Sequence, residues 1–208
     1  MITSFRQLPL GRYLEILEVN RDESLTDLER QVKTLSLLSD MSEEEILHLP
    51  IAEYREMVGA SRFVESYDEA SVLVAKKYHI GGMDLIPVTD FRKVETAQYV
   101  DFQTFSADPE KNLVEILSTF LVPRGHRYNE GYDILDVHKA VRENLSVAEA
   151  VSLSAFFLTL CRQLTEDSLN YCKREIRGLK DGPEKERLTR EIQALEMRLR
   201  TNGDGSPT

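Results

Sequence analysis

The feature that most constrains this fold is a pair of helix-start signals far apart in the chain. Ser42 is followed three residues later by Glu45, and Ser146 is followed at the same spacing by Glu149. In such a capping box each side chain binds a backbone N–H group that the first helical turn leaves unpaired. Pro50 cannot continue the first of these helices. Both signals favour helices, and Pro50 separates the first from another predicted helix over residues 51–65.

Helical spacing of apolar residues extends this pattern to other segments. Leu28, Val32 and Leu35 recur at the interval of one helix face, after a start at Ser24-Leu25-Thr26-Asp27. Aromatic residues at positions 99, 102 and 105 suit one face of a further helix. Asp108-Pro109 is predicted to open the next helix, with Pro109 at its first position, and Pro123 to end it. Residues 12–19 fit a helix slightly better than a strand, and residues 134–144 are predicted to form another helix.

One segment interrupts the helical pattern. Tyr78 to Val88 reads YHIGGMDLIPV, in which Gly81-Gly82 separates two short apolar runs. Paired glycines adopt the positive φ angles that a tight hairpin turn needs, so we expect a β-hairpin with Pro87 at a strand end or edge. The predicted fold class is therefore mainly α with one small β-hairpin, in a helical domain over residues 1–160.

The C-terminal part predicts an antiparallel helical hairpin over residues 161–201, followed by a flexible tail over residues 202–208. Asp181-Gly182-Pro183 breaks the chain between two arms whose apolar residues recur at three- and four-residue intervals. The two arms can satisfy each other, or the seam can mediate self-association or partner docking, and we weigh these equally. The seam is the predicted protein-interaction surface, formed by Leu169, Ile176, Leu179, Leu188, Ile192, Leu195 and Leu199.

Charge and composition exclude several classes of protein. The formal net charge is −10 over 208 residues, which argues against nucleic acid as a partner, because phosphate binding needs clustered Lys and Arg. No apolar run is long enough for a membrane span, and the N-terminus lacks a signal-peptide pattern, so we expect a cytoplasmic protein. Cys161 and Cys172 would lie roughly 16 Å apart on one helix, too far for a disulfide. The sequence contains no Cys-x-x-Cys pair, so we do not expect a structural zinc site.

The best candidate for chemistry is RGHRYNEGYDILDVH, residues 124–138, with His126, Asp133, Asp136 and His138. These residue types could form a metal or acid–base site. In a helix over 134–144, however, Asp136 and His138 point about 200° apart. Asp133 is then expected to cap the helix, with Asp136 in its first turn. We therefore predict no catalytic, cofactor-binding or metal-binding residues in this stretch, and no cofactor for the protein.

Three stretches together resemble a known group of proteins. They are residues 8–58, which include MSEEEILHLPIAEYREM; the paired strands around IGGMDLIPV; and residues 99–158, which run from YVDFQTF through LVPRGHRY. Their order is similar to the tail assembly chaperones and related small virion-assembly proteins of tailed bacteriophages. In that family a "q-y-x-D-F" helix precedes a segment of the form "L-x-P-x-G-x-x-Y". The similarity covers residues 8–160 and leaves out the C-terminal hairpin.

The resemblance implies a protein without enzymatic activity that binds other phage structural or assembly proteins, and that can form a homo-oligomer. It implies a place in the cytoplasm of the host bacterium during assembly, and it is compatible with a place in the virion. Two alternatives remain at this point. One is a regulatory module that docks on a host or phage protein. The other is a small enzyme with a carboxylate–histidine site in residues 126–138.

Overall fold

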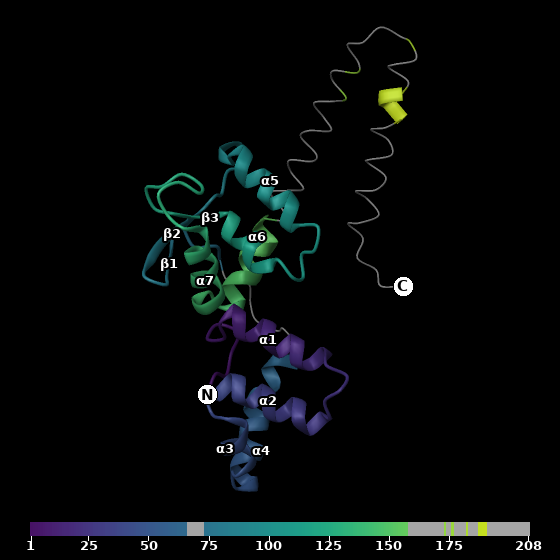
Figure 1. The fold of residues 1–208 in the computed structure, drawn as a ribbon, viewed down its shortest axis with the longest axis vertical. Helices are drawn as coiled ribbons and strands as arrows, with labels where there is room; N and C mark the ends of the chain where they lie inside the picture. Colours follow the sequence, from purple (N-terminus) through teal and green to yellow (C-terminus); the bar gives the residue numbers. More distant parts are fainter. Residues whose placement is uncertain (66–72, 158–172, 174–175, 177–181, 183–186, 191–208) are drawn as a thin grey trace. The chain divides into compact units, whose positions relative to one another are not determined.

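The computed structural model describes residues 1–65, 73–157, 173, 176, 182 and 187–190. The chain divides into two compact units, Met1–Phe156 and Phe157–Thr208. The first unit is helical with a small antiparallel sheet, which confirms the predicted fold class. Figure 1 shows its elements along the chain, with α6 and α7 beside the sheet.

The first two helices pack against each other. α1 (Leu10–Arg21) and α2 (Asp27–Ser39) confirm the two N-terminal helix predictions, and α1 is longer than the 12–19 segment predicted for it. Ile16 of α1 joins a buried cluster with Phe5, Leu8 and Leu38. Burial of such side chains contributes about 1.5–3 kcal/mol each.

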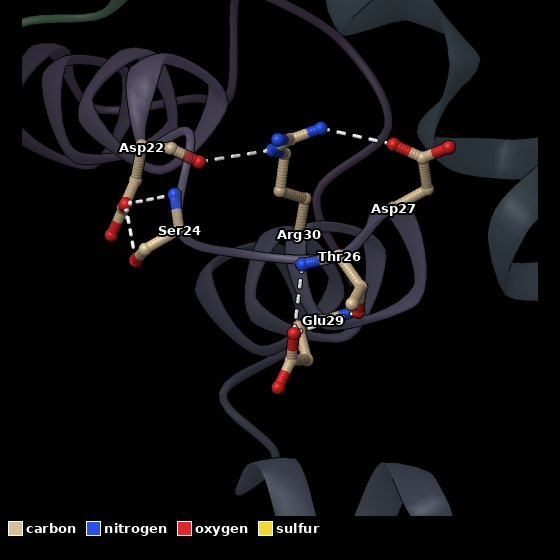
Figure 2. Close-up of polar contacts among 6 residues, drawn as sticks. All are labelled: Asp22, Ser24, Thr26, Asp27, Glu29 and Arg30. Atoms are coloured by element: carbon tan, nitrogen blue, oxygen red, sulfur yellow. Dashed lines mark hydrogen bonds and ion pairs between the residues drawn. The ribbon is translucent and has the colours of Figure 1, made fainter.

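Side-chain contacts fix the turn between α1 and α2 (Figure 2). Asp22 Oδ1 accepts hydrogen bonds from both the backbone N and the hydroxyl of Ser24, at 2.9 and 2.6 Å. Thr26 and Glu29 form a capping box at the start of α2. Arg30 of α2 donates to the Asp22 carbonyl at 3.3 Å and to Asp27 Oδ1 at 2.9 Å. This one side chain therefore joins the residue that follows α1 to the first turn of α2.

Two further helices complete the N-terminal region. Ser42 and Glu45 form the predicted capping box at the start of α3 (Glu43–Leu47), and Pro50 immediately precedes α4 (Ile51–Ser61). The chain continues into the short 3₁₀ helix η1 (Arg62–Glu65). Tyr54, Met57 and Val58 pack against the cluster of Val32, Leu35 and Ile46. Leu28 does not share this face, because 56% of it is exposed.

The glycine pair forms the predicted hairpin, but the sheet has a third strand. β1 (Tyr78–Ile80) and β2 (Met83–Pro87) pair antiparallel, with Gly81 and Gly82 at φ +56° and +76°. β3 (Leu121–Pro123) pairs with the other edge of β2, with Leu85 opposite Pro123. The prediction that Pro123 ends a helix is therefore wrong. Val88 N donates to the carbonyl of Phe120 at 2.9 Å, and this pairing with β2 takes the chain out of the helix.

The helix before β3 is also shorter than predicted. α5 (Thr96–Phe105) is followed by turns, and α6 (Leu113–Thr119) begins after Pro109 rather than at it. Asn112 Nδ2 donates to the Phe105 carbonyl at 3.1 Å, which ties the turn to the end of α5. A side chain that binds the backbone in this way competes with helix formation.

The aromatic residues of α5 do not share one buried face. Tyr99 is 47% exposed, whereas Gln98 is buried and donates to the Thr119 carbonyl at 2.9 Å. Phe102 packs edge-to-face on Phe120, with ring centroids 5.3 Å apart. The face of α5 that meets the core therefore includes a polar residue with a specific partner.

The last elements of the unit return to its N-terminus. α7 (Ile134–Asn144) has the predicted bounds, and a helix described over residues 147–157 follows it. Ser146 and Glu149 form the predicted capping box, with Ser146 N donating to Glu149 at 3.0 Å. Leu10 N donates to the Leu145 carbonyl, and Val147 N donates to the Leu8 carbonyl. The chain segments before α1 and after α7 are thus hydrogen-bonded to each other.

Candidate functional site

The candidate stretch begins with a loop between β3 and α7 whose backbone makes two turns. His126 N donates to the Pro123 carbonyl and Glu130 N donates to the Arg127 carbonyl, both at 3.1 Å. Gly125 and Gly131 have φ of +85° and +78°, a region that glycine adopts without steric cost. Gly125 follows β3, and Gly131 lies two residues before Asp133, the N-cap of α7.

Asp133 caps α7, as predicted. Its Oδ1 accepts a hydrogen bond from Leu135 N at 2.9 Å, and its backbone is extended, as is typical of a residue that precedes a helix. Asp136 lies exposed in the first turn of α7, where a negative charge suits the helix dipole. Both carboxylates therefore have roles in starting a helix.

His126 contacts its own loop. Its ring meets Tyr132 edge-to-face at 5.8 Å, and its Nδ1 lies 3.2 Å from the Glu130 carbonyl. Because a carbonyl oxygen only accepts, we assign the proton of this contact to Nδ1. A Cβ atom at Gly131 would lie only 2.8 Å from Nδ1, so glycine at this position makes room for the ring.

His138 lies in a different environment, between α5 and α6. Its ring meets Phe105 edge-to-face at 6.5 Å. Its Nε2 is buried, and among the described residues it has no hydrogen-bond partner; the same is true of Glu115 Oε2 on α6. Burial lowers the pKa of His138, and the negative charges of Glu115 and Asp133 oppose that shift. The charges of Glu115 and Asp133 thus both act on the half-buried imidazole of His138.

Each of the four candidate residues thus has its own main contact or environment. His126 meets Tyr132, Asp133 caps α7, Asp136 is exposed, and His138 meets Phe105. Within the part of the chain that the structure describes, no group of three or more His, Cys, Asp or Glu residues could hold a metal ion.

One pair at this loop does not follow from the sequence patterns alone. Tyr128 is buried, and its hydroxyl donates to Asp101 Oδ2 of α5 at 2.8 Å. Burial and the bond to Asp101 both raise the pKa of Tyr128. The two residues belong to the two sequence patterns "q-y-x-D-F" and "L-x-P-x-G-x-x-Y". Each pattern describes its own segment of the chain, and neither indicates that the two segments meet.

The predicted interaction seam lies mostly outside the described residues. Of its members, Ile176 and Leu188 are described, and each is helical and partly buried. The other five, together with Cys161 and Cys172, are outside the described part: Leu169, Leu179, Ile192, Leu195 and Leu199. The hairpin seam therefore stays a prediction.

Comparisons with protein-family models, with curated proteins and with solved structures found no significant match. Among the residues that the structure describes, no helix has both the length and the apolar character that a membrane span requires.

Proposed function

We propose that this chain is a non-enzymatic morphogenesis protein of a tailed bacteriophage, similar to a tail assembly chaperone or a small virion-associated protein. It would act through contacts with other phage structural or assembly proteins, in the cytoplasm of the host bacterium. Oligomerisation through the predicted C-terminal seam is part of the proposal.

The observation that carries the proposal is the bond between Tyr128 and Asp101. These residues come from the two patterns on which the resemblance to the phage family rests, and they meet at 2.8 Å with Tyr128 buried. The second pattern also contains Leu121 and Pro123, which are buried in β3. One residue from each of the two patterns thus contacts the other in this fold, and this contact supports the proposal.

The placement of the candidate catalytic residues also supports a function through binding. Asp133 caps a helix and His126 binds the Glu130 carbonyl, so both polar groups have structural partners. An acid–base pair needs its members within reach of one substrate atom. The helical spacing of Asp136 and His138 directs those two side chains away from each other.

The proposal can be tested in the phage that carries this gene. A stop codon early in the gene should leave host lysis intact but reduce the yield of complete particles, with unjoined heads or aberrant tails in negative-stain electron micrographs. Supplying the full chain from a plasmid should restore complete particles. Normal particle yield and morphology with the stop codon would overturn the proposal.

A further inference from the structure

The outer face of the sheet forms a groove. Ile86 of β2 and Val122 of β3 lie opposite each other in the strand register and are half-buried. Their neighbours Leu85 and Leu121 are fully buried on the other face. The groove has a volume of about 410 Å³, and Val88 adds to its apolar floor. We call it the sheet groove.

Two acidic side chains on the rim of the sheet groove already have basic partners. Asp90 accepts from Arg92 at 3.0 Å, just before the 3₁₀ helix η2 (Phe91–Lys93). Glu95 accepts from the two guanidinium nitrogens of Arg127 at 3.2 and 3.3 Å. The two carboxylates that line the groove are thus each paired with an arginine, of which Arg127 also lines the groove.

Two other cations on the same rim have no ion-pair partner within the described part of the chain. Lys93 and Arg124 both line the sheet groove and are exposed, and neither forms an ion pair with another described residue. The backbone of Arg124 is fixed, because its N–H group donates to the Asp84 carbonyl at 2.8 Å. In a chain with a net charge of −10, an apolar floor edged by two such cations is a local exception.

We propose that the sheet groove binds a short acidic segment of a partner protein. Carboxylates of that segment would pair with Lys93 and Arg124, and an aliphatic side chain between them would cover Ile86 and Val122. This inference deepens the proposed function and rests on it for the identity of the partner as an assembly protein. The candidate stretch takes part, because residues 124–128 line the groove.

Charge complementarity favours an acidic peptide over a nucleic acid. Binding to a nucleic-acid backbone generally uses several clustered cations, whereas this rim offers two that are not engaged in ion pairs with described residues, on a strongly acidic chain. The apolar floor suits an aliphatic side chain rather than a phosphate. Electrostatic pairing at a groove of this kind selects the partner, and burial of the aliphatic side chain adds affinity.

Fluorescence anisotropy of the full chain tests this inference. The probe is a fluorescein-labelled octapeptide that alternates Glu with Val, compared with the same peptide carrying Gln in place of Glu. We expect the Glu peptide to bind more tightly, and the double variant Lys93→Glu/Arg124→Glu to weaken that binding roughly tenfold or more. The matched control is Lys76→Glu/Lys139→Glu, which reverses two charges elsewhere and should leave binding within about twofold of the unaltered chain.

Val122→Thr tests the apolar floor separately, and it should weaken binding of the Glu peptide by roughly threefold or more without changing the rim charges. Equal binding of the Glu and Gln peptides, or equal loss in both charge-reversal pairs, would overturn the proposal. So would displacement of the peptide by a single-stranded oligonucleotide of eight nucleotides at the same concentration. Because this assay measures binding directly, its failure is distinct from a failure of the particle-yield experiment.

Discussion

The helical region over residues 1–65 and the sheet region over residues 73–145 are stabilised in different ways. In the first, each helix packs on a neighbour close in sequence, and the turns are fixed by short-range contacts such as Thr26 with Glu29. In the second, the loop after β3 and the start of α5 are themselves tied to distant residues, as with Tyr128 and Asp101 or Gln98 and the Thr119 carbonyl. Bonds of similar span in the first region, such as Tyr54 with Gln31, join one helix to another. A substitution in a loop should therefore affect a distant element in the sheet region and an adjacent turn in the helical region.

The largest effect should come from Gly81, where the hairpin of the sheet region touches α7. A Cβ atom there would lie 2.6 Å from Ala140 Cβ, and the φ of +56° is also unfavourable for alanine. Gly81→Ala should lower the free energy of unfolding by about 2–4 kcal/mol. Gly82 also has a positive φ, but the space around its Cβ position is open, so Gly82→Ala should lower the free energy of unfolding by only about 1–2 kcal/mol. Urea denaturation of the two variants measures the difference; equal losses would contradict the close packing.

A second glycine pair compares the contact between the two regions with an open position inside the helical region. A Cβ atom at Gly11 of α1 would lie 2.8 Å from the Arg142 carbonyl of α7, where the regions meet. Gly11→Ala should destabilise by about 1–3 kcal/mol. Gly59 of α4 has nothing within 4 Å of its Cβ position, so Gly59→Ala should stabilise by about 0.5–1 kcal/mol through helix propensity. Thermal unfolding should therefore give shifts of opposite sign, and shifts of the same sign would refute this comparison.

The two regions also differ in what can be predicted from the sequence. Where a cap residue binds the first helical turn, adjacent residues suffice, and the starts at Ser42, Ser146 and Asp133 are predicted correctly. The start predicted at Asp108-Pro109 is wrong, because α6 begins only at Leu113. The same reasoning wrongly puts Leu121 in a helix, because the sequence does not reveal that β2 offers it an unpaired edge.

In the candidate site too, contacts between adjacent residues are predictable from the sequence and contacts between distant residues are not. The cap formed by Asp133 is predictable from the residues beside it. The bond of Tyr128 to Asp101 is not, because it joins residues 27 positions apart that the fold brings together. The place of His138 beside Phe105 likewise depends on how α5, α6 and α7 pack.

The bond between Tyr128 and Asp101 gives the next largest effect. Tyr128→Phe removes the buried hydroxyl and leaves Asp101 without its donor, so it should cost about 1–2 kcal/mol of stability. Tyr132→Phe removes a hydroxyl that accepts from Asn129 N at the exposed part of the loop, and should cost about 0.5 kcal/mol. Urea denaturation distinguishes them. A larger loss for Tyr132→Phe would mean that the loop is fixed locally, as the turns of the helical region are.

The smallest effect is the contribution of His138 to pH dependence. Burial lowers the pKa of its folded-state imidazole below the unfolded value of about 6.5. As the pH falls below about 6.5, the unfolded chain binds this proton first, so stability decreases until the folded-state pKa is passed. His138→Gln should remove this part of the pH dependence. The change amounts to less than about 1 kcal/mol in the free energy of unfolding between pH 7.5 and pH 5.

Glu115→Gln provides the matched variant for His138. The Glu115 carboxylate favours the charged imidazole, so its removal should lower the pKa of His138 further and extend the loss of stability to lower pH. Thermal midpoints recorded across the pH range for the three proteins test both expectations. An unchanged pH profile in His138→Gln would show that the buried imidazole does not contribute.

Under the proposed function, residues 126–138 shape the protein and do not perform chemistry. The direct test is complementation of the stop-codon phage by the variant His126→Gln/Asp133→Asn/His138→Gln, in which the Asp133→Asn change keeps a side-chain oxygen for the cap of α7. We predict an infectious titre within about threefold of the unaltered chain. Removal of an acid–base group typically costs about 10²–10⁴ in rate, so a drop in titre of that size by a folded variant would contradict a purely structural role.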